Sequence, residues 1–183
     1  MSNISASQVK ELRERTGLGL MDCKKALEEA NGDLDLAVEE LRKSSGLKAS
    51  KKSSRSAADG LIGIKSNDGK SFMVEINCET DFVARDDSFN QFMQEVLEIV
   101  STNRDKSLEE LLESEIDEKR EKLVQKLGEN IVVRRVAASV DTADSSGVYL
   151  HSNSKIGAII SLEGGTEEVA KEIAMHAAAT DPI

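Results

Sequence analysis

The chain has 183 residues, of which 39% are hydrophobic, 32% are charged and 3% are aromatic, and its formal net charge is −10. This composition is typical of a folded protein with an aliphatic core in one or two domains. The acidic balance disfavours direct binding to nucleic acid or to anionic membranes, because both repel negative charge. The N-terminus has no signal-peptide pattern and no apolar run approaches about 20 residues, so we expect a cytoplasmic protein without a membrane span.

Three short helices are predicted within residues 1–45. Ser5 and Gln8 have the spacing of a capping box at the start of the first helix, and Gly17 is placed to end it. Asp33 is the expected N-cap of the third helix. Apolar residues recur at three- and four-residue steps and predict a shared core of Val9, Leu12, Cys23, Ala26, Leu27, Ala30, Leu34, Ala37, Val38 and Leu41. A bundle of this size buries little surface, so we expect it to dock on another structure.

Residues 46–59 differ in composition from the helices before them. Small and polar residues dominate, with four cations, Lys48, Lys51, Lys52 and Arg55. We interpret this stretch as a solvated linker between domains. A basic arm that binds phosphate is the alternative, which the absence of aromatic residues and the acidic chain disfavour.

A β-hairpin followed by a helix is predicted from residue 60 onwards. Leu61, Ile62 and Ile64 indicate one strand, and residues 67–69 (Asn-Asp-Gly) indicate a tight turn. The return strand covers residues 72–78, where apolar and polar residues alternate. Asp86 or Asp87 then caps a helix whose buried face is Phe89, Phe92, Met93 and Val96.

The same order of elements is predicted a second time near the C-terminus. Residues 147–151 and 156–162 indicate two strands, and residues 166–179 indicate a helix. Between the two copies we expect helices over 108–112 and 116–127 and a strand over 131–140. The pattern predicts an α+β fold with antiparallel sheet, in which residues 60–140 form a first core subdomain and residues 141–183 begin a second, incomplete one.

The sequence shows no apparatus for catalysis or for a cofactor. His151 and His176 lack a neighbouring cysteine or nucleophilic serine motif. Cys23 and Cys78 lie in separate predicted elements, so we expect two small buried residues and neither a disulfide nor a metal site. We therefore expect a protein that is not an enzyme and that acts by binding.

Phe82 lies where the predicted strand over 72–78 gives way to the next helix, and it belongs to neither apolar stripe. One interpretation is that its ring folds back into the core or staples the helix start. The other is that Asp81 and Phe82 are delivered to a sheet edge or loop, where the ring can wedge into another protein.

Several stretches of the chain, in the same order, resemble the bacterial elongation factor Ts family. They are Val9 to Gly17, Met21 to Leu27, Cys78 to Ala84, Leu127 to Asn130 and Ile173 to Ala177. The resemblance implies that the N-terminal three-helix domain is similar to a ubiquitin-associated domain and contacts the nucleotide-binding domain of elongation factor Tu. By position in that family, the contact residues in this domain are Val9, Lys10, Arg13 and Met21.

The resemblance also assigns a role to the junction at Phe82. In this family an Asp-Phe pair, here Asp81 and Phe82 flanked by Thr80 and Val83, inserts into elongation factor Tu near its magnesium and phosphate sites. The remaining positions that the family places at or near this contact surface are Gly128, Glu129, Asn130 and His151. The implied function is guanine nucleotide exchange during translation elongation, with GDP-bound and nucleotide-free elongation factor Tu as partners and with no cofactor.

Two alternatives from other classes remain open at this point. A non-catalytic adaptor that binds a helical or ubiquitin-like partner predicts an exposed groove on the first helices and no role for Phe82. A nucleic-acid-binding protein that uses residues 48–55 predicts strongly salt-dependent binding. Long members of the family continue past the position of residue 183 and short members dimerise, so we expect either a fragment or a homodimer.

Overall fold

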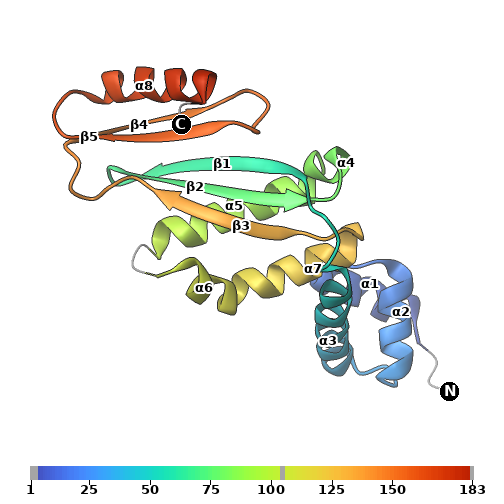
Figure 1. Cartoon of the computed structure of the whole chain (residues 1–183). Coiled ribbons are helices and arrows are strands. Elements are labelled where there is room, and N and C mark those ends of the chain that lie inside the picture. The colour runs from blue at the N-terminus through green and yellow to red at the C-terminus, as the bar shows by residue number, and fades with distance from the viewer. Residues whose placement is uncertain (1–3, 104–105, 182–183) are drawn as a thin grey trace. The chain divides into compact units, whose positions relative to one another are not determined.

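The computed structural model describes residues 4–103 and 106–181. Helices and antiparallel sheets are mixed along the chain, which confirms the predicted α+β class (Figure 1). The described residues form two compact units. The first contains residues up to Arg55 together with Asp117–Asn130, and the second contains Ser56–Ile116 together with the chain from Ile131 onwards.

The first unit is built from helices, and the caps predicted for the first and third of them are present. Ser5 and Gln8 form the capping box of the first helix, which Gly17 ends in a left-handed conformation with φ 68°. The Asp33 carboxylate caps the third helix by accepting from two backbone N–H groups. The four helices are α1 (Ala6–Thr16), α2 (Leu20–Glu29), α3 (Leu34–Lys52) and α7 (Asp117–Leu127). The ten predicted core residues lie in one hydrophobic cluster, with Leu34 and Val38 at its edge.

The expected linker over residues 46–59 is wrong in its first half, because α3 continues as a helix to Lys52. Ser45 and Ala49 are buried on this extension. The Ser45 hydroxyl donates a hydrogen bond to Gln125 of α7, and Gly46 leaves room for the Glu121 carboxylate. The N-terminal bundle therefore ends later than residue 45 and includes a fourth helix from a distant part of the chain.

The second unit contains a three-stranded antiparallel sheet in the order β1-β2-β3. Its strands are β1 (Asp59–Asn67), β2 (Lys70–Cys78) and β3 (Val132–Ala138). Helix α5 (Asp87–Thr102) begins after the N-cap Asp86, as one of the two predicted alternatives, and packs on one face of β1 and β2. Close packing explains Gly63, because a Cβ atom there would lie 2.7 Å from side-chain atoms of Met93 and Leu97.

Residues 108–127, between α5 and β3, are helical without the predicted break. Ser107 and Glu110 form the expected capping box, in which each backbone N–H donates to the other residue's side chain. Helix α6 (Leu108–Leu111) is followed by a π-helical turn (Leu112–Ile116) and then by α7. The wider π turn replaces the interruption that we expected between residues 112 and 116.

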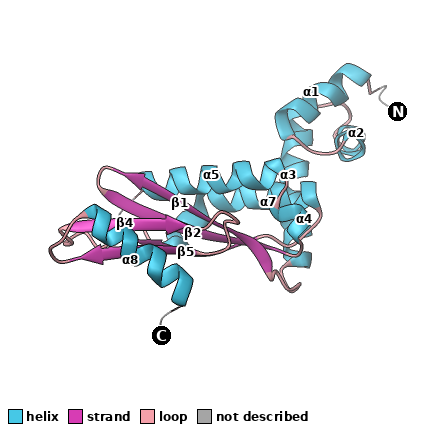
Figure 2. Ribbon diagram, turned by 90° about the horizontal axis from the view of Figure 1, so that it is seen from above, coloured by secondary structure: helices cyan, strands magenta, loops and turns pink. Residues whose placement is uncertain are grey.

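The second predicted hairpin and helix are present as β4 (Ser145–Leu150), β5 (Gly157–Leu162) and α8 (Glu167–Thr180). The two strands pair with each other as a separate sheet, and α8 lies along one face of it (Figure 1, Figure 2). Gly157 lies against the side chains of Met73 and Ile62, which brings the hairpin onto the sheet of β1 and β2. None of the described helices is long and apolar enough to cross a membrane.

Candidate functional site

The junction after β2 is a single helical turn that ends in the start of the next helix. Helix α4 (Asp81–Ala84) has Thr80 as its N-cap, and the Thr80 hydroxyl accepts from the backbone N–H of Val83 at 3.4 Å. Asp86 caps α5 only two residues after α4 ends. Two N-capping residues six positions apart therefore place a short turn where we expected a loop or a sheet edge.

Phe82 projects from this turn into solvent. Its exposed fraction is 81%, whereas Ala84 on the same turn is buried. The interpretation of Phe82 as a core or staple residue is therefore wrong. An aromatic side chain of this kind can bury about 150–250 Å² in a contact.

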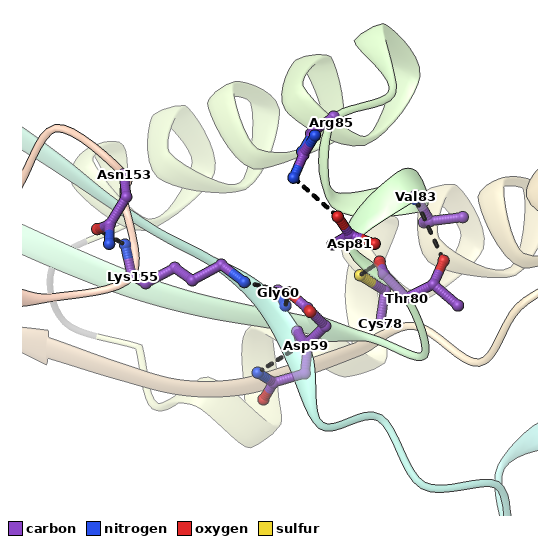
Figure 3. Close-up of polar contacts among 10 residues, drawn as sticks. Asp59, Gly60, Cys78, Thr80, Asp81, Val83, Arg85, Asn153 and Lys155 are labelled. Carbon is purple, nitrogen blue, oxygen red and sulfur yellow. Dashed lines mark hydrogen bonds and ion pairs between the residues drawn. The ribbon is translucent and has the colours of Figure 1, made fainter.

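The backbone of the turn is fixed by contacts on both sides of Phe82. The Arg85 guanidinium pairs with the Asp81 carboxylate at 2.8 Å across one turn of the helix. The buried Cys78 thiol donates to the backbone carbonyl of Thr80 at 3.2 Å. Figure 3 shows these contacts around α4. Phe82 is thus an exposed side chain on an ordered backbone.

The four residues implied for the three-helix domain have different environments. Lys10, Arg13 and Met21 are exposed, and Met21 has an exposed fraction of 71%. Val9 is only 7% exposed and belongs to the helical core. Its side chain packs in the core, so only the other three side chains are accessible at the surface.

The stretch after α7 is tied into the first unit. Gly128 takes a left-handed conformation, and its carbonyl accepts from Lys52. Glu129 is half-buried. Asn130 is 2% exposed, and its amide donates to the carbonyls of Ser53 and Arg55. Asn130 therefore has a structural role that its position in the family's contact stretch did not indicate.

His151 lies in the turn between β4 and β5. Its side chain is exposed, and its Nδ1 is 2.9 Å from the hydroxyl of Tyr149. In the same turn, Lys155 donates to the Asp59 carboxylate at 2.7 Å. No local pattern indicates the pairing of Lys155 with Asp59, because 96 positions separate the two residues.

The described residues include no group of three or more histidine, cysteine, aspartate or glutamate side chains that could hold a metal ion. Cys23 and Cys78 are both buried, as predicted. The described residues also include an ordered turn with a projecting aromatic ring and an exposed helical surface. They define an α+β protein with exposed apolar side chains on two of its helical elements.

Comparison with known proteins identifies the family. The family described as Elongation factor TS matches residues 79–183, which include α4 and Phe82. Curated relatives named Elongation factor Ts are 53% identical over 184 residues in Hahella chejuensis, 51% identical over 184 in Marinobacter nauticus and 50% identical over 189 in Francisella tularensis subsp. novicida. Each alignment covers 100% of this chain and 63–64% of the relative. The chain belongs to the elongation factor Ts family and spans a little under two thirds of the length of these relatives.

Proposed function

We propose that this chain is a guanine nucleotide exchange factor for elongation factor Tu. It promotes the release of GDP during translation elongation by binding, without a covalent step. The observation that carries the proposal is the 81% exposure of Phe82 on a capped and ion-paired turn. Membership of the elongation factor Ts family supports the choice of partner.

The energy for such an exchange comes from differential binding. Burial of a phenylalanine side chain in a partner contributes about 1.5–3 kcal/mol. A magnesium ion neutralises the charge of bound phosphates, so a contact that displaces the ion's ligands weakens nucleotide binding. By thermodynamic linkage, a factor that weakens GDP binding is itself bound less tightly by the GDP-loaded partner, by the same ratio. The factor therefore binds the nucleotide-free partner more tightly.

The exposed side chains of Lys10, Arg13 and Met21 support a second contact through the three-helix domain. A separate anchoring surface would hold the partner while Phe82 distorts its nucleotide site.

The setting of this activity is the cytoplasm, where elongation takes place. A homodimer stays a prediction that the sedimentation coefficient of the purified chain checks.

The test is the dissociation rate of fluorescent GDP from elongation factor Tu in excess unlabelled nucleotide. We expect the chain to accelerate dissociation, and Phe82→Ala to reduce the acceleration at least about tenfold, which corresponds to about 1.4 kcal/mol of lost contact. Val140→Ala is a matched control, because Val140 is an exposed apolar residue of the same unit. Full acceleration by Phe82→Ala would exclude the wedge. Binding without acceleration would favour the adaptor alternative.

A further inference from the structure

Two contacts connect the turn between β4 and β5 with the first strand of the larger sheet. The Lys155 ammonium donates to the Asp59 carboxylate at 2.7 Å, and the backbone N–H of Ile62 donates to the carbonyl of Ser154 at 2.6 Å. In Figure 3, Lys155 extends along the sheet to reach Asp59 at the start of β1. The turn is therefore attached to β1 through both a side chain and the backbone.

The turn has a defined shape that fixes the origin of the Lys155 side chain. The His151 N–H donates to the Ile156 carbonyl at 2.9 Å, and the Ser154 N–H donates to the His151 carbonyl at 2.8 Å. Ser154 takes a left-handed conformation with φ 55°. The Lys155 N–H then donates to the Asn153 side-chain oxygen at 3.0 Å. A closed turn of this kind presents the lysine in one direction.

Asp59 is held in turn against the end of β2, from which α4 begins. It pairs with Cys78 in the strand register. Its carbonyl accepts from the Asn77 amide at 3.1 Å, and its carboxylate accepts from the Gly60 N–H at 2.8 Å. Cys78 in turn donates to the Thr80 carbonyl, next to the cap of α4. A continuous set of contacts thus leads from Lys155 to the turn that carries the aromatic ring.

The charges in this region are arranged so that each acid has its own cation. Asp81 pairs with Arg85 at 2.8 Å, across the turn that contains Phe82. The hydrogen bond from Lys155 is the main reason that the pKa of Asp59 lies below its ordinary value, and the charge of Arg85 lowers it further. Both acids are therefore paired with a cation, Asp59 with Lys155 and Asp81 with Arg85.

We infer that Lys155 and Asp59 are positioning residues for Phe82, through which the β4–β5 turn holds the exchange wedge in place. Loss of the Lys155 side-chain contact releases Asp59, which lies opposite Cys78 at the end of β2, and loosens the start of α4. The inference rests on the proposed exchange function for its consequence, but the positional effect can be measured without the partner.

The positional effect is tested with an indole probe at residue 82. The chain has no tryptophan, and Phe82 is exposed, so Phe82→Trp supplies a single emission at the wedge without disturbing the core. In this background we expect Lys155→Met to lower the residual time-resolved anisotropy of the indole and Lys155→Arg to restore it. Lys65→Met is the matched control, since Lys65 pairs with Glu98 of α5 towards the other end of β1. An unchanged anisotropy with Lys155→Met, or an equal fall with Lys65→Met, would overturn the inference.

The functional consequence is tested with native Phe82 in the GDP dissociation assay. We expect Lys155→Met to lower the saturating exchange rate about two- to fivefold, the range typical of a solvent-accessible ion pair, while the half-saturating concentration changes little. Lys155→Arg should retain the native rate, because it keeps the positive charge. Loss of folded protein would not distinguish the two substitutions in this way. An unchanged saturating rate with Lys155→Met would overturn the link to exchange. If the native chain itself fails to accelerate dissociation, the proposed function fails, and the anisotropy alone decides whether Lys155 positions residue 82.

Discussion

At the scale of single residues, two phenylalanines seven positions apart in the sequence have opposite environments. Phe89 is fully buried beneath the sheet, whereas Phe82 is 81% exposed on α4. The same aromatic side chain therefore packs in the core at one position and lies in solvent at the other. The difference follows from the turn at α4, which carries Phe82 outside both apolar stripes.

This contrast predicts opposite effects on stability. We expect Phe82→Ala to change the free energy of unfolding by less than about 0.5 kcal/mol, because no core contact is lost. Phe89→Ala should lower it by about 3–5 kcal/mol through the cavity it creates. Urea unfolding followed by circular dichroism measures both. A loss of more than about 1 kcal/mol with Phe82→Ala would exceed the effect of ordinary surface substitutions. It would mean that the ring packs against other residues of the folded chain.

The ion pair of Asp59 and Lys155 predicts a pH dependence. The Lys155 hydrogen bond, and then that from Gly60, hold the pKa of Asp59 below its ordinary value of 3.8. Because the folded pKa is the lower one, the stabilisation is complete above about pH 4 and is lost as the pH falls through the folded pKa. Lys155→Met should therefore reduce stability at pH 6–7 by less than about 1 kcal/mol, and this difference should vanish at lower pH. A difference that persists unchanged at pH 2 (roughly two units below the free carboxyl) would exclude this origin.

At the scale of elements, α8 and the β4–β5 sheet are in backbone-to-backbone contact at one glycine. A Cβ atom on Gly147 would lie 2.2 Å from the backbone nitrogen of Lys171 and 2.3 Å from the carbonyl carbon of Ala170. Neither backbone atom can move away without shifting the helix. The close approach therefore fixes how α8 covers the strand.

Gly147→Ala should separate α8 from β4. We expect a loss of at least about 1–3 kcal/mol in the free energy of unfolding, as in overpacked cores. Ser146→Ala is the neighbouring control, because Ser146 is half-buried and the substitution adds no atom to its side chain. Thermal unfolding of the two variants makes the comparison. Equal midpoints would contradict the close packing that the glycine provides.

Local chemistry explains which elements the sequence predicted. The capping pairs at Ser5 and Ser107 and the N-caps Asp33 and Asp86 act over three or four residues, so they are visible in a short stretch of sequence. The extension of α3 to Lys52 depends instead on α7, which supplies its packing partner from a distant part of the chain. Without α7 in view, the small and polar residues at the end of α3 have the composition of a linker.

The candidate site divides in the same way. The exposure of Phe82 excludes the core interpretation that spacing alone left open, whereas its contact with a partner stays a prediction. The burial of Val9 and Asn130 and the pairing of Asp59 with Lys155 depend on tertiary contacts. No pattern of neighbouring residues reports such contacts.

At the scale of the whole molecule, the two units do not follow the order of the chain. Residues 117–130 belong with the N-terminal helices although 61 residues of the other unit precede them. Cooperative opening usually involves residues that pack together. The division into two units therefore predicts which distant segments lose protection from amide hydrogen exchange together.

Hydrogen exchange should reveal this grouping. Ala49→Asp places a charge at a position with 2% exposure on α3 and should destabilise its unit by several kcal/mol. We expect faster amide exchange in residues 6–52 and in 117–127, with little change in β1 and β2. Leu47→Asp, at an exposed position of the same helix, is the control. Faster exchange confined to residues before 55 would contradict the grouping of α7 with the N-terminal helices.

The discontinuous first unit has a consequence for synthesis on the ribosome. At 5–20 residues per second, about 4–15 s pass between the addition of Arg55 and that of Asn130. During this interval the face of α3 that contains Ser45 and Ala49 has no α7 to cover it. Nascent chains stalled before α7 should therefore be cleaved by protease between residues 45 and 52, and chains stalled well after it should be protected. The N-terminal unit begins first and is completed only after much of the second has been made.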